Sequence, residues 1–481
     1  MEKTTAIPHA CEATARVVEL EQRLTDVTRE LEAIKARHVR RSERMPSVKK
    51  EARAKGEIPA LADGNKNREK DSRAKLPKEL VRTHVAPEHC TCPKCGAAMQ
   101  KTGETQDTIV ERIPEQLVHR TVVNETRACG CGHEVSSQRP VRAWEQSDFG
   151  PKLVAHVVVQ KVVDSKPLYR ESKALARAGL KIHRNTLVDM FHGAAGALRP
   201  IWVRLLDRVA DSALVLADET SIKVMALEKC RMAFMWVFLN KEVIAYCFAP
   251  GRSGETPRKV LGKSNGNQTI LVDAYSGYNQ LVRLDGWDRA GCIAHGRRKM
   301  FEAKDSSPSA ITALNFIRWM YVVEHDAEEL GIKGTAEHLE MRRTRTLFIF
   351  REYYRWLVAE RPLHGPQTKM GKAVRYALKQ RHAWMRIFRD AAIPLDNNAS
   401  ESALRIVALL RKNALFVGHD ESGENHAILL SLAATCQLHG VNPEEYLADV
   451  LIRVQTHPAA RLDDLMPQNW KILFASAPTA D

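Results

Sequence analysis

Two continuous apolar segments that run into acidic residues constrain the fold of this chain more than any other feature. SALVLADET reaches Asp218 and Glu219, and TILVDAYSGY reaches Asp273. Uninterrupted apolar runs of this length are typical of central strands that are buried on both faces. Between them, RMAFMWVFL and VIAYCFA predict two more strands. We therefore expect an α/β core in which Asp218 and Asp273 stand at the ends of two strands, at one edge of the sheet.

A third carboxylate, Glu401, stands at the beginning of a later helical segment. Pro394 and a polar cluster precede an apolar and basic pattern at helical spacing, which runs from Ala399 to a stop at Gly418. This pattern places Glu401 in the first turn of the helix. Arg405 and Lys412 follow on the same stripe of that helix and are candidates for phosphate contact, as is the neighbouring Arg411.

The same helix start has a purely structural interpretation. Asn398 as N-cap with Glu401 at position N3 resembles a capping box, which serves helix stability alone. Together with Asp218 and Asp273, however, Glu401 completes a set of three carboxylates. Such a set suits two Mg²⁺ or Mn²⁺ ions in a phosphoryl-transfer site, because these ions prefer oxygen ligands and keep positions for water and phosphate.

The segment from 291 to 301, GCIAHGRRKMF, predicts a short strand that passes into a basic helix. Arg297 and Arg298 are interpreted as phosphate contacts. Cys292 and His295 form a CxxH pair that hints at metal binding, but no second pair lies nearby in the sequence, so His295 is interpreted as structural or site-lining. Residues 306–392 then predict long helices whose aromatic side chains are more often core than base-stacking groups.

The N-terminal part of the chain differs in composition from the rest. From Val17 to Ile34, apolar residues alternate at spacings of three and four, which predicts a short coiled coil and homo-oligomerisation. From Lys35 to Arg82, 16 Lys/Arg face 7 Asp/Glu, which is a large share of the net charge of +15. A basic, flexible tether of this kind favours a nucleic-acid partner, although a merely soluble linker has the same composition.

Five of the ten cysteines fall within about 40 residues, in CTCPKCGAAM and RACGCGH. Because the N-terminus lacks an apolar signal core, clustered cysteines indicate metal binding rather than disulfides. A zinc ribbon with four thiolate ligands and a structural Zn²⁺ is expected. The predicted ligands are Cys92, Cys95, Cys129 and Cys131, with Cys90 and His133 as alternatives.

Residues 150 to 200 look helical throughout, with a break at Gly179 and a second helix starting near Asn185. This fits a helix-turn-helix in which Lys181, Arg184 and Asn185 face DNA, but a plain helical hairpin fits equally well. The GKS sequence at 262 to 264 is not a phosphate-binding loop, because Pro257 stands where its first glycine should be.

At this point a resemblance becomes specific. LADETSIKV, LVDAYSGYNQL, CIAHGRRKM, LDNNASESALRIVALLRKNALFVGHDESG and NPEEYLADVL resemble successive blocks of the insertion sequence 66 family of bacterial DDE transposases. The resemblance covers nearly the whole chain. It implies an RNase H-like fold in which Asp218, Asp273 and Glu401 are the catalytic triad. The implied reaction is Mg²⁺-dependent cleavage of transposon ends and strand transfer into target DNA.

The chain departs from the family pattern at two places. No proline follows the threonine in DETSIKV, and Ser402 stands after the glutamate where an arginine is usual. The implied partners are terminal inverted repeats, target DNA, a second copy of the chain and accessory proteins of the same element. We expect no membrane insertion and a cytoplasmic, nucleoid-associated protein. A non-catalytic DNA-binding regulator and a nuclease without strand transfer are the alternatives.

The expected domains, in chain order, are a coiled coil (12–45), a basic linker (46–85), a zinc-ribbon-like domain (86–145), a helix-turn-helix-like domain (150–205), the first part of the RNase H-like core (210–305), a helical insertion (306–392), the second part of the core (393–440) and a helical tail (441–481).

Overall fold

The structure, a computed structural model, describes residues 149–226 and 229–475 without further gaps. It also describes Cys95, 117–118, 126–128, 134–136, 142–144 and Ser147. The expected coiled coil and basic linker lie outside the described residues, as do Cys92, Cys129 and Cys131 of the expected zinc site. Cys95 is exposed. The short strands β1 (Thr126–Ala128) and β2 (Glu134–Ser136) pair antiparallel.

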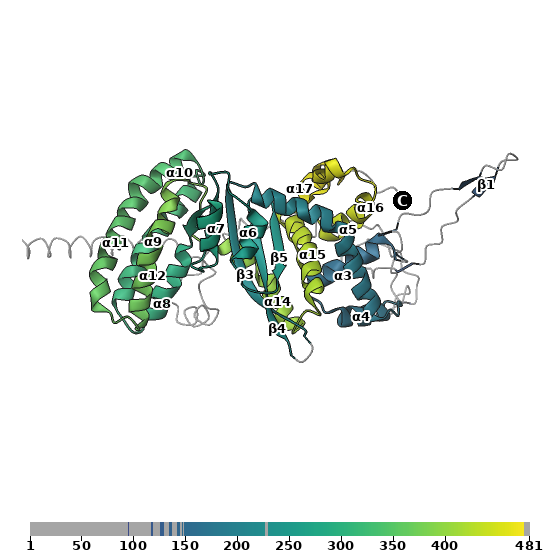
Figure 1. The fold of residues 1–481 in the computed structure, drawn as a ribbon, viewed down its shortest axis with the longest axis horizontal. Helices are drawn as coiled ribbons and strands as arrows, with labels where there is room; N and C mark the ends of the chain where they lie inside the picture. Colours follow the sequence, from purple (N-terminus) through teal and green to yellow (C-terminus); the bar gives the residue numbers. More distant parts are fainter. Residues whose placement is uncertain are drawn as a thin grey trace, which may run out of the picture. The chain divides into compact units, whose positions relative to one another are not determined.

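A five-stranded mixed sheet forms the centre of the described chain (Figure 1). Its order is β5-β4-β3-β6-β7; β3, β6 and β7 are parallel neighbours, and β4 runs antiparallel to β3 and β5. The strands are β3 (Leu214–Val224), β4 (Arg231–Leu239), β5 (Ile244–Ala249), β6 (Thr269–Val272) and β7 (Asp288–Gly291). The α/β core expected from the sequence is thereby confirmed.

The edge strand β5 is covered by a helix that supplies hydrogen bonds as well as apolar contacts. Helix α15 (Asp420–Leu438) is buried along most of its length. The hydroxyl of Ser431 accepts the backbone N–H of Tyr246 at 2.7 Å, and that of Thr435 accepts the N–H of Ile244 at 3.2 Å. An open edge would leave these donors free to pair with another chain, so α15 closes the sheet on that side.

In the sequence, the other helices of the core lie before the sheet, between its strands or after its last strand. They are α3 (Pro151–Val162), α4 (Leu168–Arg177), α5 (Arg184–Ala210), α6 (Glu255–Leu261), α7 (Tyr278–Asp285), α8 (Ile293–Ala303), α13 (Asn398–Ala403), α14 (Arg405–Asn413), α16 (Pro443–Arg453), η6 (Ala459–Leu465) and α17 (Pro467–Leu473). Within the residues that the structure describes, no helix is both long and apolar enough to span a bilayer.

Two helices separated by a break stand before the sheet, as expected for either a helix-turn-helix or a plain helical hairpin. Gly179 adopts φ +99°, a left-handed conformation that suits glycine, and ends the first helix. Helix α5 begins at Arg184, beside the predicted start, and Lys181, Arg184 and Asn185 are all exposed. Helix α5 extends for 27 residues and packs against α15, α3 and β5. DNA contact by its exposed first turn stays a prediction.

Residues 309–388 are helical almost throughout, as expected for the insertion, and stand together beside the sheet in Figure 1. The helices are α9 (Ser309–Glu329), α10 (Ala336–Met341), a π-turn η3 (Arg342–Thr346), α11 (Leu347–Glu360), η4 (Arg361–Leu363), α12 (Lys369–Trp384) and η5 (Met385–Phe388). Phe350, Tyr353, Tyr354 and Trp384 are buried, so the core interpretation of these aromatic residues is correct.

The insertion contacts the core chiefly through α12, which packs on α8 and β7. The indole of Trp384 lies against Gly291 and Gly296, where an added Cβ would come within 2.9 Å and 2.5 Å of ring atoms. Glycine at these two positions is therefore what allows the indole to approach the start of α8.

Candidate active site

Asp218 lies in the middle of β3, and the expectation that it ends a strand is wrong. β3 continues to Val224 because the antiparallel partner β4 pairs with it along that whole length. The parallel partner β6 does end where expected, at Val272. Since Leu216 pairs with Leu271, Asp218 and Asp273 stand at the same level of the two strands, two residues farther on.

The carboxyl of Asp218 is in an environment that disfavours its charge. Burial raises its pKa to about 7, and the nearby carboxylates of Glu219, Asp273 and Glu401 add to the shift. The backbone N–H of Glu219, which donates to Asp218 Oδ1 at 2.9 Å, opposes it. A partly buried group surrounded by other carboxylates is one that a divalent cation would stabilise.

Glu219, the neighbour of Asp218, is hydrogen-bonded by other side chains of the protein. Its side chain is 1% exposed, and its Oε1 accepts a hydrogen bond from Arg252 Nε at 2.8 Å. The buried Tyr278 donates its hydroxyl to Oε2 at 2.7 Å. The guanidinium of Arg252 also lies over the ring of Tyr275, 3.9 Å from its centroid. Of the two adjacent acids, Asp218 is therefore the one that no cationic side chain of the described residues contacts.

Glu401 lies in the first turn of α13, as predicted, but the capping-box interpretation is wrong. The N-cap is Asn397 rather than Asn398, and its side chain makes no capping hydrogen bond. The prediction of one helix that continues to Gly418 is also wrong. Helix α13 ends at Ala403, α14 begins at Arg405, and α14 ends at Asn413.

The fully buried Asn397 fastens the Glu401 helix to the core. Its side-chain Nδ2 donates to the carbonyl of Ala217 at 2.8 Å, directly before Asp218 in β3. Its Oδ1 accepts the hydroxyl of Ser400 at 2.6 Å, and its backbone N–H donates to the Sγ of Cys292 at 3.3 Å. Asn397 thus connects β3, α8 and α13, which carry the candidate site residues.

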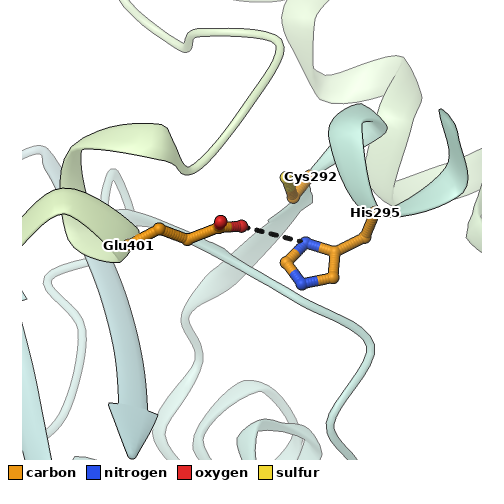
Figure 2. A group of neighbouring side chains, drawn as sticks. All are labelled: Cys292, His295 and Glu401. Atoms are coloured by element: carbon orange, nitrogen blue, oxygen red, sulfur yellow. Dashed lines mark ion pairs between the residues drawn. The ribbon is translucent and has the colours of Figure 1, made fainter. Parts of the chain in front are cut away.

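Cys292 and His295 meet Glu401 at the start of α8 (Figure 2). One potential ligand atom of each residue lies within 4.8 Å of the other two, and this is the one such group of three among the residues described. Asp218 and Asp273 are not part of it. The distance from His295 Nδ1 to Glu401 Oε1 is 3.8 Å, too long for a hydrogen bond. Burial raises the pKa of the Cys292 thiol to about 11.

The expected phosphate contacts divide into exposed and engaged side chains. Arg298 donates to Glu401 Oε2 at 3.3 Å and is more than half exposed, with Arg297 exposed beside it. Arg405 and Lys412 are exposed on α14. Arg411 instead donates to the carbonyl of Ser221 at 2.9 Å, so it has a structural bond to β3.

Reasoning from the sequence missed the role of Asn397 and the meeting of Cys292 and His295 with Glu401. The CxxH spacing was a visible signal, but the third member of the group comes from more than 100 residues farther along the chain. For Asn397, the only sequence signal was a polar residue shortly after the apolar Leu395, before the helix begins. Many surface loops have the same pattern.

The pKa of Asp218 predicts a pH dependence of stability in metal-free protein. Its folded pKa of about 7 lies above the ordinary value of 3.8, so the folded state keeps a proton that the unfolded state has lost. Relative to Asp218→Asn, the wild-type free energy of unfolding should fall as pH rises from about 4 to about 7, by at most about 4 kcal/mol. Urea unfolding in EDTA measures this difference, and parallel pH profiles for the two proteins would contradict it.

Two protein-family models match this chain. A family model described as "Transposase IS66 family" matches residues 146–425, and one described as "IS66 C-terminal element" matches residues 431–468. Two relatives from Sinorhizobium fredii (strain NBRC 101917 / NGR234) are described as uncharacterized proteins. The protein y4hP is 28% identical over 84% of this chain and 78% of its own length. The protein y4jD is 28% identical over 82% of this chain and 81% of its own length.

Proposed function

The chain belongs to the IS66 family of transposases, and from that premise we propose that it cleaves transposon ends and joins them to target DNA at Asp218, Asp273 and Glu401. Family membership implies DNA binding and the use of divalent metal ions. The proposed core is RNase H-like, with the helical insertion between its second and third acidic residues. The observation that carries the proposal is the environment of Asp218, whose pKa is raised by burial and by the carboxylates of both Asp273 and Glu401.

The donor set fits two Mg²⁺ or Mn²⁺ ions, because three carboxylates supply oxygen ligands and, in the part of the chain that the structure describes, no cationic side chain pairs with Asp218. When bound, the ions would activate the attacking oxygen and stabilise the leaving oxygen. Asp218, Asp273 and Glu401 would hold them. Glu219 would remain with Arg252 and Tyr278, shaping the wall of the site.

The cationic side chains around Glu401 would act on the DNA backbone. Arg298 contacts Glu401 and is exposed, so it can reach a phosphate next to the third carboxylate. Arg297, Arg405 and Lys412 are exposed and can offset further phosphate charge. Asn397 would hold the Glu401 helix in place through its bond to Ala217. Recognition of the inverted repeats by the zinc-ribbon and α4–α5 regions belongs to the same proposal.

One assay tests the proposal. The full-length protein is incubated with Mg²⁺ and a labelled DNA that carries the inverted repeat flanking its gene. The expected result is a nick that leaves a 3′ hydroxyl at the transposon end, lost in Asp273→Asn although that variant still binds the DNA. DNA binding without cleavage, unchanged by Asp273→Asn, would instead favour a non-catalytic DNA-binding regulator.

A further inference from the structure

We propose that Cys292, His295 and Glu401 form a second cation site that takes a thiophilic divalent ion such as Zn²⁺. The three residues come from the β7–α8 junction and from α13. Their potential ligand atoms lie within 4.8 Å of one another. Figure 2 shows the imidazole and the carboxylate turned toward each other, with the cysteine beside them.

Two polar atoms of this group have no hydrogen-bond partner within the described part of the chain. They are Nδ1 of His295 and Oε1 of Glu401, which are both shielded from solvent and which no described residue hydrogen-bonds. They are 3.8 Å apart, beyond hydrogen-bonding distance. Buried polar atoms without partners are uncommon, and an ion between them is one of the arrangements that explains such a pair. The whole side chains of His295 and Glu401 are only 21% and 28% exposed.

The chemistry of the donors selects the ion. One sulfur, one imidazole nitrogen and one carboxylate oxygen suit Zn²⁺, whereas Mg²⁺ avoids sulfur and prefers oxygen alone. Ligand atoms around a tetrahedral Zn²⁺ are roughly 3.3–3.8 Å apart, so a small inward shift of these side chains is enough. Three protein ligands leave a fourth position for water. Cys292 would lose its proton to solvent on binding, and the N–H of Asn397 already donates to its sulfur.

Occupation of this site has a consequence that rests on the proposed function. Glu401 would be shared between the Zn²⁺ site and the catalytic Mg²⁺ site, because it is the one residue common to both sets. A Zn²⁺ ion bound by Cys292 and His295 would hold the Glu401 carboxylate away from Asp218 and Asp273. Zn²⁺ should therefore compete with Mg²⁺-dependent cleavage.

Metal binding by the full-length protein tests the site without any DNA. The chain has ten cysteines, so the readout is the difference between variants. Wild type should retain about one Zn²⁺ per chain more than Cys292→Ser, and should show stronger thiolate-to-Co²⁺ absorption when titrated with Co²⁺. His295→Gln, at a partly exposed position, should weaken the same Zn²⁺ affinity at least about tenfold. Cys230→Ser, which removes an exposed cysteine, is the matched control and should behave as wild type.

Thermal unfolding in EDTA checks that each variant is folded before metal is added. Equal Zn²⁺ content and equal Co²⁺ spectra in wild type, Cys292→Ser and His295→Gln would overturn the site. The competition is measured as the ratio of cleavage rates with and without Zn²⁺ at fixed Mg²⁺ for each protein. An equal ratio in wild type and Cys292→Ser would overturn the competition. If no protein cleaves DNA, the proposed function fails, and the metal content still decides the site.

Discussion

Asp218→Asn is expected to reduce Mg²⁺-dependent cleavage of transposon-end DNA by at least about 10³-fold, because it removes a ligand charge at the point where phosphate charge develops. Asparagine keeps the size of the side chain, and the N–H of Glu219 can still donate to its oxygen. The variant should therefore bind DNA as wild type does. Single-turnover cleavage of an end-labelled substrate and a gel-shift titration measure the two properties separately.

Glu219→Gln is the matched control, since it changes the adjacent acid in the same way. The one oxygen of glutamine can still accept the hydrogen bond from Arg252, and its NH2 group can donate to the hydroxyl of Tyr278, so cleavage should fall by no more than about tenfold. Loss of cleavage in Glu219→Gln, with activity retained in Asp218→Asn, would show that Glu219 is the metal ligand. Glu219→Ala is a poorer control, because it leaves the buried hydroxyl of Tyr278 without its acceptor at a cost of about 1–3 kcal/mol.

The strands and long helices of this fold were predictable because buried elements have a local pattern of apolar residues in the sequence. The continuous apolar runs of β3, β4 and β5 follow from a sheet buried on both faces. The length of β3 was not predictable in the same way. Polar residues from Asp218 to Ser221 read as a strand end, yet hydrogen bonds to the distant β4 keep them in the strand.

The candidate site was predictable only as a set of residue types. Spacing and resemblance named Asp218, Asp273 and Glu401, but the contacts that bring their elements together are long-range. Asn397 reaches across 180 residues of sequence to Ala217, and Glu401 meets His295 across more than 100. A sequence pattern can suggest where a helix begins and which residue caps it. It does not show that the buried side-chain amide of Asn397 anchors the helix to β3, because that contact depends on the tertiary packing.

The helical insertion is physically connected to the same site. Tyr321 of α9 donates its hydroxyl to Asp396 Oδ2 at 3.0 Å, directly before Asn397. Trp384 of α12 packs on Gly291 and Gly296, on either side of Cys292 and His295. The insertion therefore supports both the loop that carries Glu401 and the helix that carries His295, and its stability should affect the position of Glu401.

Glu324→Ala is expected to destabilise the insertion by about 3–5 kcal/mol, because it leaves a buried guanidinium without its counter-ion. Arg342 is 1% exposed and bonds both oxygens of Glu324, at 2.7 and 2.6 Å. Its Nη1 also donates to the carbonyls of Ile387 and Asp390, in the segment that returns to the core. Urea unfolding followed by tryptophan fluorescence measures the loss.

Glu329→Ala, at an exposed position of the same helix, should change stability by less than about 0.5 kcal/mol. Glu324→Leu combined with Arg342→Met removes both charges and should recover only part of the loss, because the apolar pair needs no counter-ion but the carbonyls of Ile387 and Asp390 lose their donor. Equal destabilisation by Glu324→Ala and Glu329→Ala would mean that the buried pair does not hold the insertion together.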